Sequence, residues 1–344
     1  MHVLSMSILL SLSSTSFAEL VINPSSGSTG QASMSWSSEE ASQLLNSDVS
    51  SLAEEVSPQG STKVTTTVRS SNGVPTYSAP KTVHIIDTSA GYSSQPSVSA
   101  RAALVMDAQT GEVLYSKNTN TALPIASITK LMTAVVIADA RLDMSEEITL
   151  QSVDFAGAGG KNSSSTLRAG DSMNRAEALL FALMKSENPA AAALARTYPG
   201  GRSAFIAAMN AKARALGMNS THYVESTGLD PHNVASARDL GILVSTASQY
   251  GLIRQFSTTA SYDFNLGYRV LKSNNTNALV RNGGWNINLS KTGYINEAGR
   301  CVVMHTTLNS RPAVVVILGA STSQSRTEDA TRLMTWASQL PKRI

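Results

Sequence analysis

The pattern of apolar and polar positions changes between residues 19–99 and 100–344. The first segment is dominated by Ser and Thr, with scattered Pro and Gly, and lacks the apolar side chains that offset chain entropy. In the second, apolar runs at 102–106 and 112–116 flank a turn closed by Gly111, which predicts a β-hairpin. We therefore expect a disordered low-complexity linker followed by one folded domain.

Apolar residues then recur at helical spacing. A helix is predicted to open at 124–127, because the apolar residues that follow share one broad face; they are Ile128, Leu131, Met132, Val135 and Val136. Ala- and Leu-rich stretches separated by turn residues predict further helices at 175–185, 188–197, 201–216 and 236–249. Apolar β-rich runs predict strands at 286–292, 301–308 and 313–318, a hairpin turn at 309–312 and a final helix at about 326–340.

The order of these elements is two strands, several helices, three strands and one helix. This order is typical of an α/β (α+β) fold, in which sheet and helices form packed layers. We expect the first and last strands to share one antiparallel sheet. The helices would be divided between the faces of this sheet and a helical subdomain.

The N-terminal residues resemble an export signal. An apolar core at 3–12 is too short to span a bilayer as a helix, and small residues, Ser16 and Ala18, precede a possible cleavage point. The segment departs from the usual pattern because it carries His2 and no Lys or Arg before the core. We expect a signal peptide at 1–18 and a periplasmic protein. No later stretch reaches 18 apolar residues, so no transmembrane anchor is expected.

Composition excludes several classes of protein. With 42% hydrophobic, 5% aromatic and 15% charged residues, the chain is unlike a coiled coil or an arginine-rich nucleic-acid binder. Residues 1–100 hold 3 basic and 7 acidic groups, which leaves 24 basic and 17 acidic groups in 101–344. This basic excess suits an anionic partner but is too diluted for nucleic acid. One cysteine, Cys301, excludes an intrachain disulfide, and the histidines lack metal-ligand spacing, so no metal or cofactor is expected.

The first candidate for chemistry is the pair Ser127 and Lys130. On a helix, positions i and i+3 share a face, so the lysine amine can reach the serine hydroxyl. Free N–H groups at a helix start can stabilise an oxyanion, and burial can lower the pKa of a lysine until it acts as a base. The pattern alone has little specificity, since Ser78 and Lys81 also match it.

Two more motifs follow in order. Ser186 and Asn188 place a hydroxyl and an amide in a turn, where they can relay a proton and hold a substrate amide. A K-T-G sequence at 291–293, placed at a strand end, combines a cation, a hydroxyl and a glycine that allows a substrate backbone to lie close. The steps are 59 residues (127 to 186) and 105 residues (186 to 291). S-x-x-K, S-x-N and K-T-G in this order are typical of penicillin-recognising serine enzymes.

The resemblance extends beyond these motifs. Residues 100–340 resemble low-molecular-mass penicillin-binding proteins of the D-alanyl-D-alanine carboxypeptidase family, and within it the D-alanyl-D-alanine endopeptidase (penicillin-binding protein 7) branch. The stretches that carry the likeness are 126–133, 167–171, 184–188, 198–201, 207–213 and 285–293. The family implies a five-stranded antiparallel sheet flanked by helices, with a helical subdomain, as in serine β-lactamases. It also implies peptidoglycan peptide stems as substrates, β-lactams as covalent inhibitors, and no cofactor.

The resemblance assigns three catalytic residues. Ser127 would be the acylated nucleophile, and Lys130 would be its base. Ser186 would pass a proton to the leaving amine. The acyl-enzyme would then be hydrolysed.

It also assigns the residues that bind the substrate. Asn188 would hold the donor peptide, Lys291 would support the proton relay, and Thr292 would bind a carboxylate of the substrate. Gly293 would allow the peptide to approach. The N–H of Tyr294 would form the oxyanion hole together with that of the nucleophile.

Three alternatives to a DD-endopeptidase remain. A DD-carboxypeptidase uses the same chemistry on terminal D-Ala, although the lack of an amphipathic tail after Trp336 favours the endopeptidase. A class A β-lactamase needs a glutamate that activates the deacylating water, and Glu225 lies in the appropriate region but resembles a family segment instead. A non-catalytic wall-binding protein would be expected to have lost a motif residue.

Overall fold

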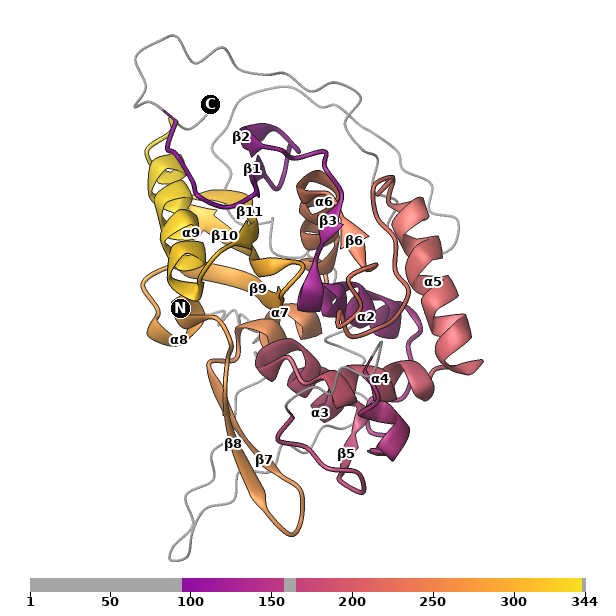
Figure 1. The fold of residues 1–344 in the computed structure, drawn as a ribbon. Coiled ribbons are helices and arrows are strands. Elements are labelled where there is room, and N and C mark those ends of the chain that lie inside the picture. Colours follow the sequence, from indigo (N-terminus) through magenta and orange to yellow (C-terminus); the bar gives the residue numbers. More distant parts are fainter. Residues whose placement is uncertain (1–94, 158–164, 342–344) are drawn as a thin grey trace, which may run out of the picture. The chain divides into compact units, whose positions relative to one another are not determined.

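A five-stranded antiparallel sheet unites the first and last strands of the domain in the computed structural model (Figure 1), which describes residues 95–157 and 165–341. The strand order is β2-β1-β11-β10-β9. β1 is buried along its whole length and pairs with β11, with Ala102 opposite Leu318. The prediction of one shared sheet is confirmed. The bounds are β1 (Ala102–Asp107), β2 (Val113–Lys117), β9 (Asn286–Ile295), β10 (Gly299–Leu308) and β11 (Arg311–Ala320).

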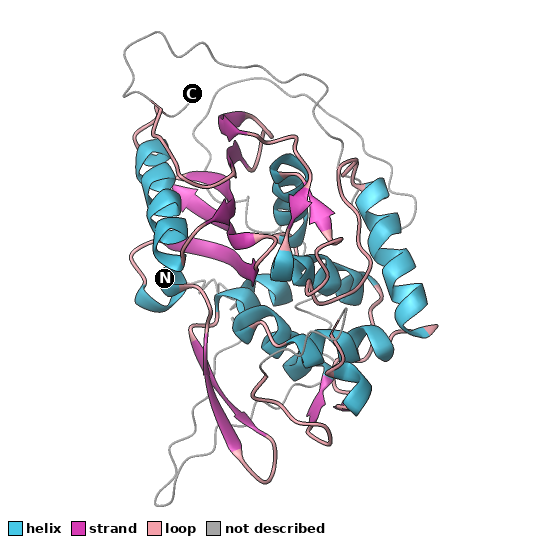
Figure 2. Cartoon of the chain, viewed as in Figure 1, coloured by secondary structure: helices cyan, strands magenta, loops and turns pink. Residues whose placement is uncertain are grey.

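Helices cover both faces of this sheet (Figure 2). Because side chains alternate along a strand, Ala103 and Val105 of β1 pack in one apolar cluster with Leu333 of α9 (Ser323–Ser338). Leu104, on the opposite face, meets α6 (Ala237–Ala247), where a Cβ on Gly241 would lie 2.8 Å from its Cδ2. The sheet is therefore the middle layer between α9 and α6.

The remaining helices belong to the region between β2 and β9. The predicted helix at 175–185 is an α-helix only to Leu180 and continues as one π-helical turn, η5. The helical elements are η2 (Ala126–Ile128), α2 (Thr129–Asp139), η3 (Ser152–Asp154), α3 (Arg175–Leu180), η5 (Phe181–Lys185), α4 (Asn188–Arg196), α5 (Gly201–Ala215), α7 (Gly251–Thr258) and α8 (Ala278–Asn282). No helix in the described ranges has the length and apolar character needed to cross a membrane.

Three small two-stranded sheets were not predicted from the sequence. The largest is a hairpin of β7 and β8 that extends away from the five-stranded sheet (Figure 1). The strands are β3 (Leu123–Pro124) with β6 (Val234–Ala235), β4 (Glu147–Thr149) with β5 (Ser172–Asn174), and β7 (Ser261–Asn265) with β8 (Val270–Asn274).

The turn between β10 and β11 is tighter than the predicted 309–312. Only Asn309 and Ser310 lie between the strands, with φ of 49° and 62°. Positive φ at both central residues is what a two-residue hairpin with right-handed strand twist requires. Pro312 therefore lies inside β11 instead of in the turn.

The predicted segments 1–18 and 19–94 lie outside the described residues. Within the remainder of the predicted linker, Ser99 is bonded to the folded domain. Its N–H and hydroxyl both donate to the carboxylate of Asp329 in α9.

Candidate active site

The candidate nucleophile, Ser127, lies in η2, which leads directly into α2. Lys130 follows in the first turn of α2, and its Nζ donates to Ser127 Oγ at 3.0 Å. The same amine donates to Asn188 Oδ1 and to the carbonyl of Thr227, both at 2.6 Å. Lys130 is fully buried, whereas Ser127 is partly exposed. The i, i+3 spacing thus places the amine beneath an accessible hydroxyl.

The backbone that presents Ser127 has an unusual conformation. Ala126 has a φ of 48°, a left-handed conformation that costs a non-glycine residue about 1–2 kcal/mol. Gly228 packs so closely that a Cβ there would lie 1.9 Å from the Ala126 carbonyl oxygen. On the other side, a Cβ on Gly293 would lie 3.0 Å from the nitrogen of Ser127. Two glycines therefore allow neighbouring segments to hold this strained turn in place.

Residues 186–188, here called the S-x-N turn, connect η5 to α4. Ser186 ends η5 with φ of 65°, and Lys291 Nζ on β9 donates to its Oγ at 2.8 Å. Lys291 also donates to the carbonyl of Thr292 at 2.9 Å. Asn188 begins α4, and its Oδ1 is occupied by Lys130. The S-x-N turn therefore lies between two buried lysines, each bonded to one of its polar side chains.

β9 carries the K-T-G motif at one edge of the sheet. Thr292 Oγ1 donates to Thr276 Oγ1 at 2.6 Å. Tyr294 is 46% exposed, and the guanidinium of Arg300 lies 3.5 Å from its ring centroid. The placement of K-T-G at a strand end was wrong, because β9 continues to Ile295 through pairing with β10. The motif therefore lies within the strand and not at its end.

Lys130 and Lys291 are two buried amines in one site. Burial lowers the pKa of Lys130 to about 7, although the carboxylates of Glu225 and Glu187 oppose the shift. Burial also lowers the pKa of Lys291 well below its usual value, and the cations Lys130 and Arg326 add to this effect. Near neutral pH, Lys130 is therefore divided between ammonium and the free amine that can accept a proton.

Comparison with known proteins places this arrangement in a family. The model of the peptidase S11 family, described as D-alanyl-D-alanine carboxypeptidase, matches residues 89–322. The chain belongs to this family. It is 47% identical over 254 residues to the D-alanyl-D-alanine endopeptidase of Pseudomonas aeruginosa, a match covering 72% of this chain and 80% of the relative. It is 46% identical over 248 residues to the D-alanyl-D-alanine endopeptidase of Escherichia coli K12, covering 71% and 78%.

Solved structures of S11 peptidases and their relatives have the same fold. The DD-transpeptidase of Streptomyces K15 matches with a TM-score of 0.66 at 28% identity, covering 72% of this chain and 100% of that one. The D-alanyl-D-alanine carboxypeptidase of Mycobacterium tuberculosis H37Rv matches with a TM-score of 0.66 at 27% identity, covering 73% and 96%. The predicted DD-peptidase-like fold and the serine peptidase class are confirmed.

In this S11 peptidase, Glu225 holds the backbone of Thr227, the residue whose carbonyl accepts a hydrogen bond from Lys130. Its Oε2 accepts from the N–H of Thr227, and its Oε1 accepts from the N–H of Gly228, both at 2.5 Å. Oε1 also accepts from Asn233 Nδ2 at 2.8 Å. Both oxygens are therefore engaged by the chain itself, unlike the water-activating glutamate that the β-lactamase hypothesis requires.

Three other residues of the S11 site were not predicted from the sequence. Glu187 is 5% exposed within the S-x-N turn. Its position between the two motif residues is a sequence signal that could have identified it. Arg326 of α9 is 8% exposed and influences Lys291. Thr276 contacts Thr292. The last two belong to no motif and reach the site only through the fold.

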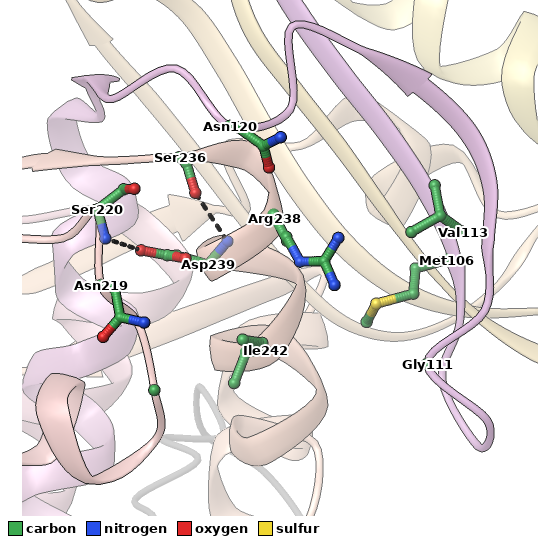
Figure 3. A pocket seen from close by; sticks show the side chains of 11 residues that line it. Met106, Gly111, Val113, Asn120, Asn219, Ser220, Ser236, Arg238, Asp239 and Ile242 are labelled. Atoms are coloured by element: carbon green, nitrogen blue, oxygen red, sulfur yellow. Dashed lines mark hydrogen bonds between the residues drawn. The ribbon is translucent and has the colours of Figure 1, made fainter. Parts of the chain in front are cut away.

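A cavity of about 340 Å³ lies between the β1–β2 hairpin and the start of α6 (Figure 3). Arg238 and Met106 are among the residues that line it, and none of the lining residues belongs to the three motifs. Asp239 in its wall accepts from the N–H of Ser220 at 2.8 Å. This cavity is therefore separate from the set of residues around Ser127.

Proposed function

We propose that this S11 peptidase is a serine DD-endopeptidase that hydrolyses D-Ala-containing cross-links of peptidoglycan through an acyl-enzyme on Ser127. The observation that carries the proposal is the 3.0 Å contact between an accessible serine hydroxyl and the buried amine of Lys130. The names of the Pseudomonas aeruginosa and Escherichia coli relatives support the endopeptidase specificity. The proposal places the enzyme in the periplasm, and this placement rests on the leader sequence alone.

Acylation begins when Ser127 Oγ attacks the D-Ala carbonyl carbon and its proton passes to the free amine of Lys130. A nearby amine with a pKa near the working pH is well suited to this general-base step. The new oxyanion accepts from the N–H groups of Ser127 and Tyr294. Such preorganised donors stabilise the tetrahedral intermediate more than the planar substrate.

The C–N bond then breaks, and the leaving nitrogen needs a proton. Ser186 Oγ donates it and is resupplied by Lys291, whose Nζ lies 2.8 Å away. The second peptide stem departs as a free amine. The proton that Lys130 took from Ser127 then passes by way of Ser186 to Lys291, so Lys130 is again a free amine and Lys291 again an ammonium. Water attacks the ester while Lys130 takes its proton, and Lys130 returns that proton to Ser127 Oγ as the C–O bond breaks, which restores the hydroxyl.

The substrate peptide lies along β9. The outer edge of this strand is not paired within the five-stranded sheet, so its backbone groups can bond to an extended peptide. Thr292 would bind a carboxylate, assisted by the positive charge of Arg326. Asn188 keeps its Nδ2 for a carbonyl of the donor, because its Oδ1 is bonded to Lys130.

The test uses the full chain with a 4,3-cross-linked muropeptide dimer and, separately, a pentapeptide monomer. Products are followed by chromatography and mass spectrometry, with Ser127→Ala as control. We expect the dimer to yield monomers, little D-Ala to leave the pentapeptide, and the variant to be inactive. Predominant release of D-Ala would instead indicate a carboxypeptidase. Unchanged substrates would favour the non-catalytic alternative. A Ser127→Ala variant as active as the wild type would show that Ser127 is not the nucleophile.

A further inference from the structure

The segment from Ser165 to Asp171, here called the bridge, is bonded at both ends to other parts of the chain. At its start, Ser165 Oγ and Thr166 Oγ1 donate to the two carboxylate oxygens of Glu187, at 2.5 Å and 2.8 Å. Glu187 is the middle residue of the S-x-N turn and is only 5% exposed. One end of the bridge is therefore tied to the catalytic machinery by charge-assisted hydrogen bonds, which are among the stronger ones.

The other end of the bridge is tied to the tip of the β7–β8 hairpin. Asp171 is 1% exposed, and its Oδ1 accepts from the hydroxyl of Tyr268. Its Oδ2 accepts from Arg269 at 2.7 Å and from the N–H of Arg168 at 2.8 Å. A buried carboxylate with this many donors has a fixed orientation. The position of the hairpin tip is therefore determined by Asp171.

The base of the hairpin is joined to the active site. The N–H of Thr276, shortly after β8, donates to the carbonyl of Met184 beside the S-x-N turn at 3.1 Å. The hydroxyl of Thr276 accepts from Thr292 of the K-T-G motif. Phe264 of β7 stacks on Phe181, the first residue of η5. The contacts thus form a closed ring through the S-x-N turn, the bridge, the hairpin and β9.

We propose that the bridge and the β7–β8 hairpin form a braced wall that binds the second peptide stem of a cross-linked substrate, and that Asp171 is its positioning residue. This inference rests on the proposed endopeptidase function. In this inference the wall binds the leaving peptide stem, at a distance from the atoms that react at Ser127.

Length supports this assignment. β8 has five residues, and at about 3.3 Å per residue its far end lies roughly 17 Å from the end beside Thr276. A small acylating agent such as a penicillin occupies only the region around Ser127. A second peptide stem extends far enough from the scissile bond to meet the hairpin.

The exposed side chains of the wall suit a peptide that carries carboxylates. Tyr268 is 64% exposed and Val270 is 45% exposed, which provides apolar contacts for alanine methyl groups. Because Arg269 neutralises Asp171, the exposed cations Arg168 and Lys272 outnumber the exposed Asp263. Tyrosine and arginine side chains are enriched at protein interfaces, and the exposed Tyr268 and Arg168 are of these types.

The experiment compares two reactions of the full chain. Tyr268→Ala and Arg269→Met remove the two side-chain contacts between the hairpin and Asp171. Arg214→Met, at an exposed arginine of α5 outside the wall, is the matched control. For each variant, kcat and KM are measured with the cross-linked dimer, and the acylation rate is measured with a fluorescent penicillin. We expect kcat/KM on the dimer to fall on the order of tenfold, mainly through KM, while penicillin acylation stays within about twofold.

Other outcomes would overturn the inference. A parallel loss of both reactions would mean that the ring only supports the fold of the site. No change on the dimer, or an equal loss in Arg214→Met, would mean that the wall does not recognise the second stem. If penicillin acylates the wild-type chain but the chain leaves the dimer intact, the proposed function is wrong. The second peptide stem is then not the ligand of the wall either.

Discussion

The reactivity of the site is determined around a single nitrogen atom, Nζ of Lys130. This nitrogen donates hydrogen bonds to three oxygen atoms, which belong to Ser127, Asn188 and Thr227. These contacts favour the ammonium form. Complete burial has the opposite effect and dominates, because it takes the charge out of water. The balance leaves the amine near its midpoint of titration at neutral pH.

We therefore expect a characteristic pH dependence of acylation. Only the free amine accepts the proton of Ser127, so the rate of acylation by a penicillin should fall about tenfold per pH unit below the Lys130 pKa of about 7 and level off above it. Glu187→Gln removes an anion that raises this pKa, so the falling limb should move to lower pH. Stopped-flow measurements of penicillin binding across this range test both points. A limb centred near the ordinary lysine pKa would contradict the assignment of Lys130 as base.

A second prediction concerns the glycine that packs on Ala126. Gly228 has φ of +85° and no room for a Cβ, whereas Gly284 has φ of +87° and open space around its Cβ position. Gly284→Ala should therefore cost only the backbone strain, about 1–2 kcal/mol. Gly228→Ala should cost at least about 3 kcal/mol more or displace Ser127, with penicillin labelling reduced on the order of a hundredfold. Thermal unfolding and labelling of both variants measure the difference, and equal effects would show that the close approach is unimportant.

At the scale of elements, the predictable parts are those with strong apolar patterning. β1 and β11 are almost continuous runs of buried apolar residues, and β10 carries four consecutive buried residues from Cys301 to Met304, so the sequence pattern was sufficient. In β7 and β8 only Phe264 and Ser273 are buried, and apolar and polar side chains are mixed, so burial provided no signal for this hairpin. The predicted helix at 175–185 ends in a π-helical turn before Ser186, and the apolar pattern of the sequence does not distinguish this turn from an α-helix.

In the candidate site, too, the residues that a sequence pattern connects were predictable and the others were not. Ser127 and Lys130 were predictable because one helical turn brings them together, and the other motifs because of their order along the chain. The hydrogen bond from Ser165 to Glu187 and that from Thr292 to Thr276 depend on how distant segments meet. Such contacts leave no periodic signal in the sequence.

The contact between α9 and the segment before β1 provides a third prediction. The buried carboxylate of Asp329 accepts from the N–H groups of Ser99 and Ala100 and from the Ser99 hydroxyl, at 2.8–2.9 Å. Asp329→Ala leaves these donors without a partner, so we expect the free energy of unfolding to fall by about 3 kcal/mol. The neighbouring Glu328 is exposed, and Glu328→Ala should change it by less than about 0.5 kcal/mol. Urea denaturation measures both, and similar values for the two variants would contradict the prediction.

At the scale of the whole molecule, the catalytic residues come from two separate parts of the chain. Ser127, Lys130, Ser186 and Asn188 precede β9, and the K-T-G motif lies on it. In the five-stranded sheet, β9 and β10 connect to β1 and β2 through β11 alone. The pairing of β1 with β11 is therefore the single seam at which the two parts of the sheet join.

This seam has a consequence for the timing of activity. During synthesis the serine and its lysine are made long before β11, the strand that completes the sheet. Pairings between the ends of a chain form late and slowly, because the entropy of closing a long loop must be overcome first. A growing chain that lacks β11 therefore already contains Ser127 and Lys130, but β9 and β10 are not yet joined to β1 and β2 in one sheet. The fold itself delays hydrolytic competence until the polypeptide is almost complete.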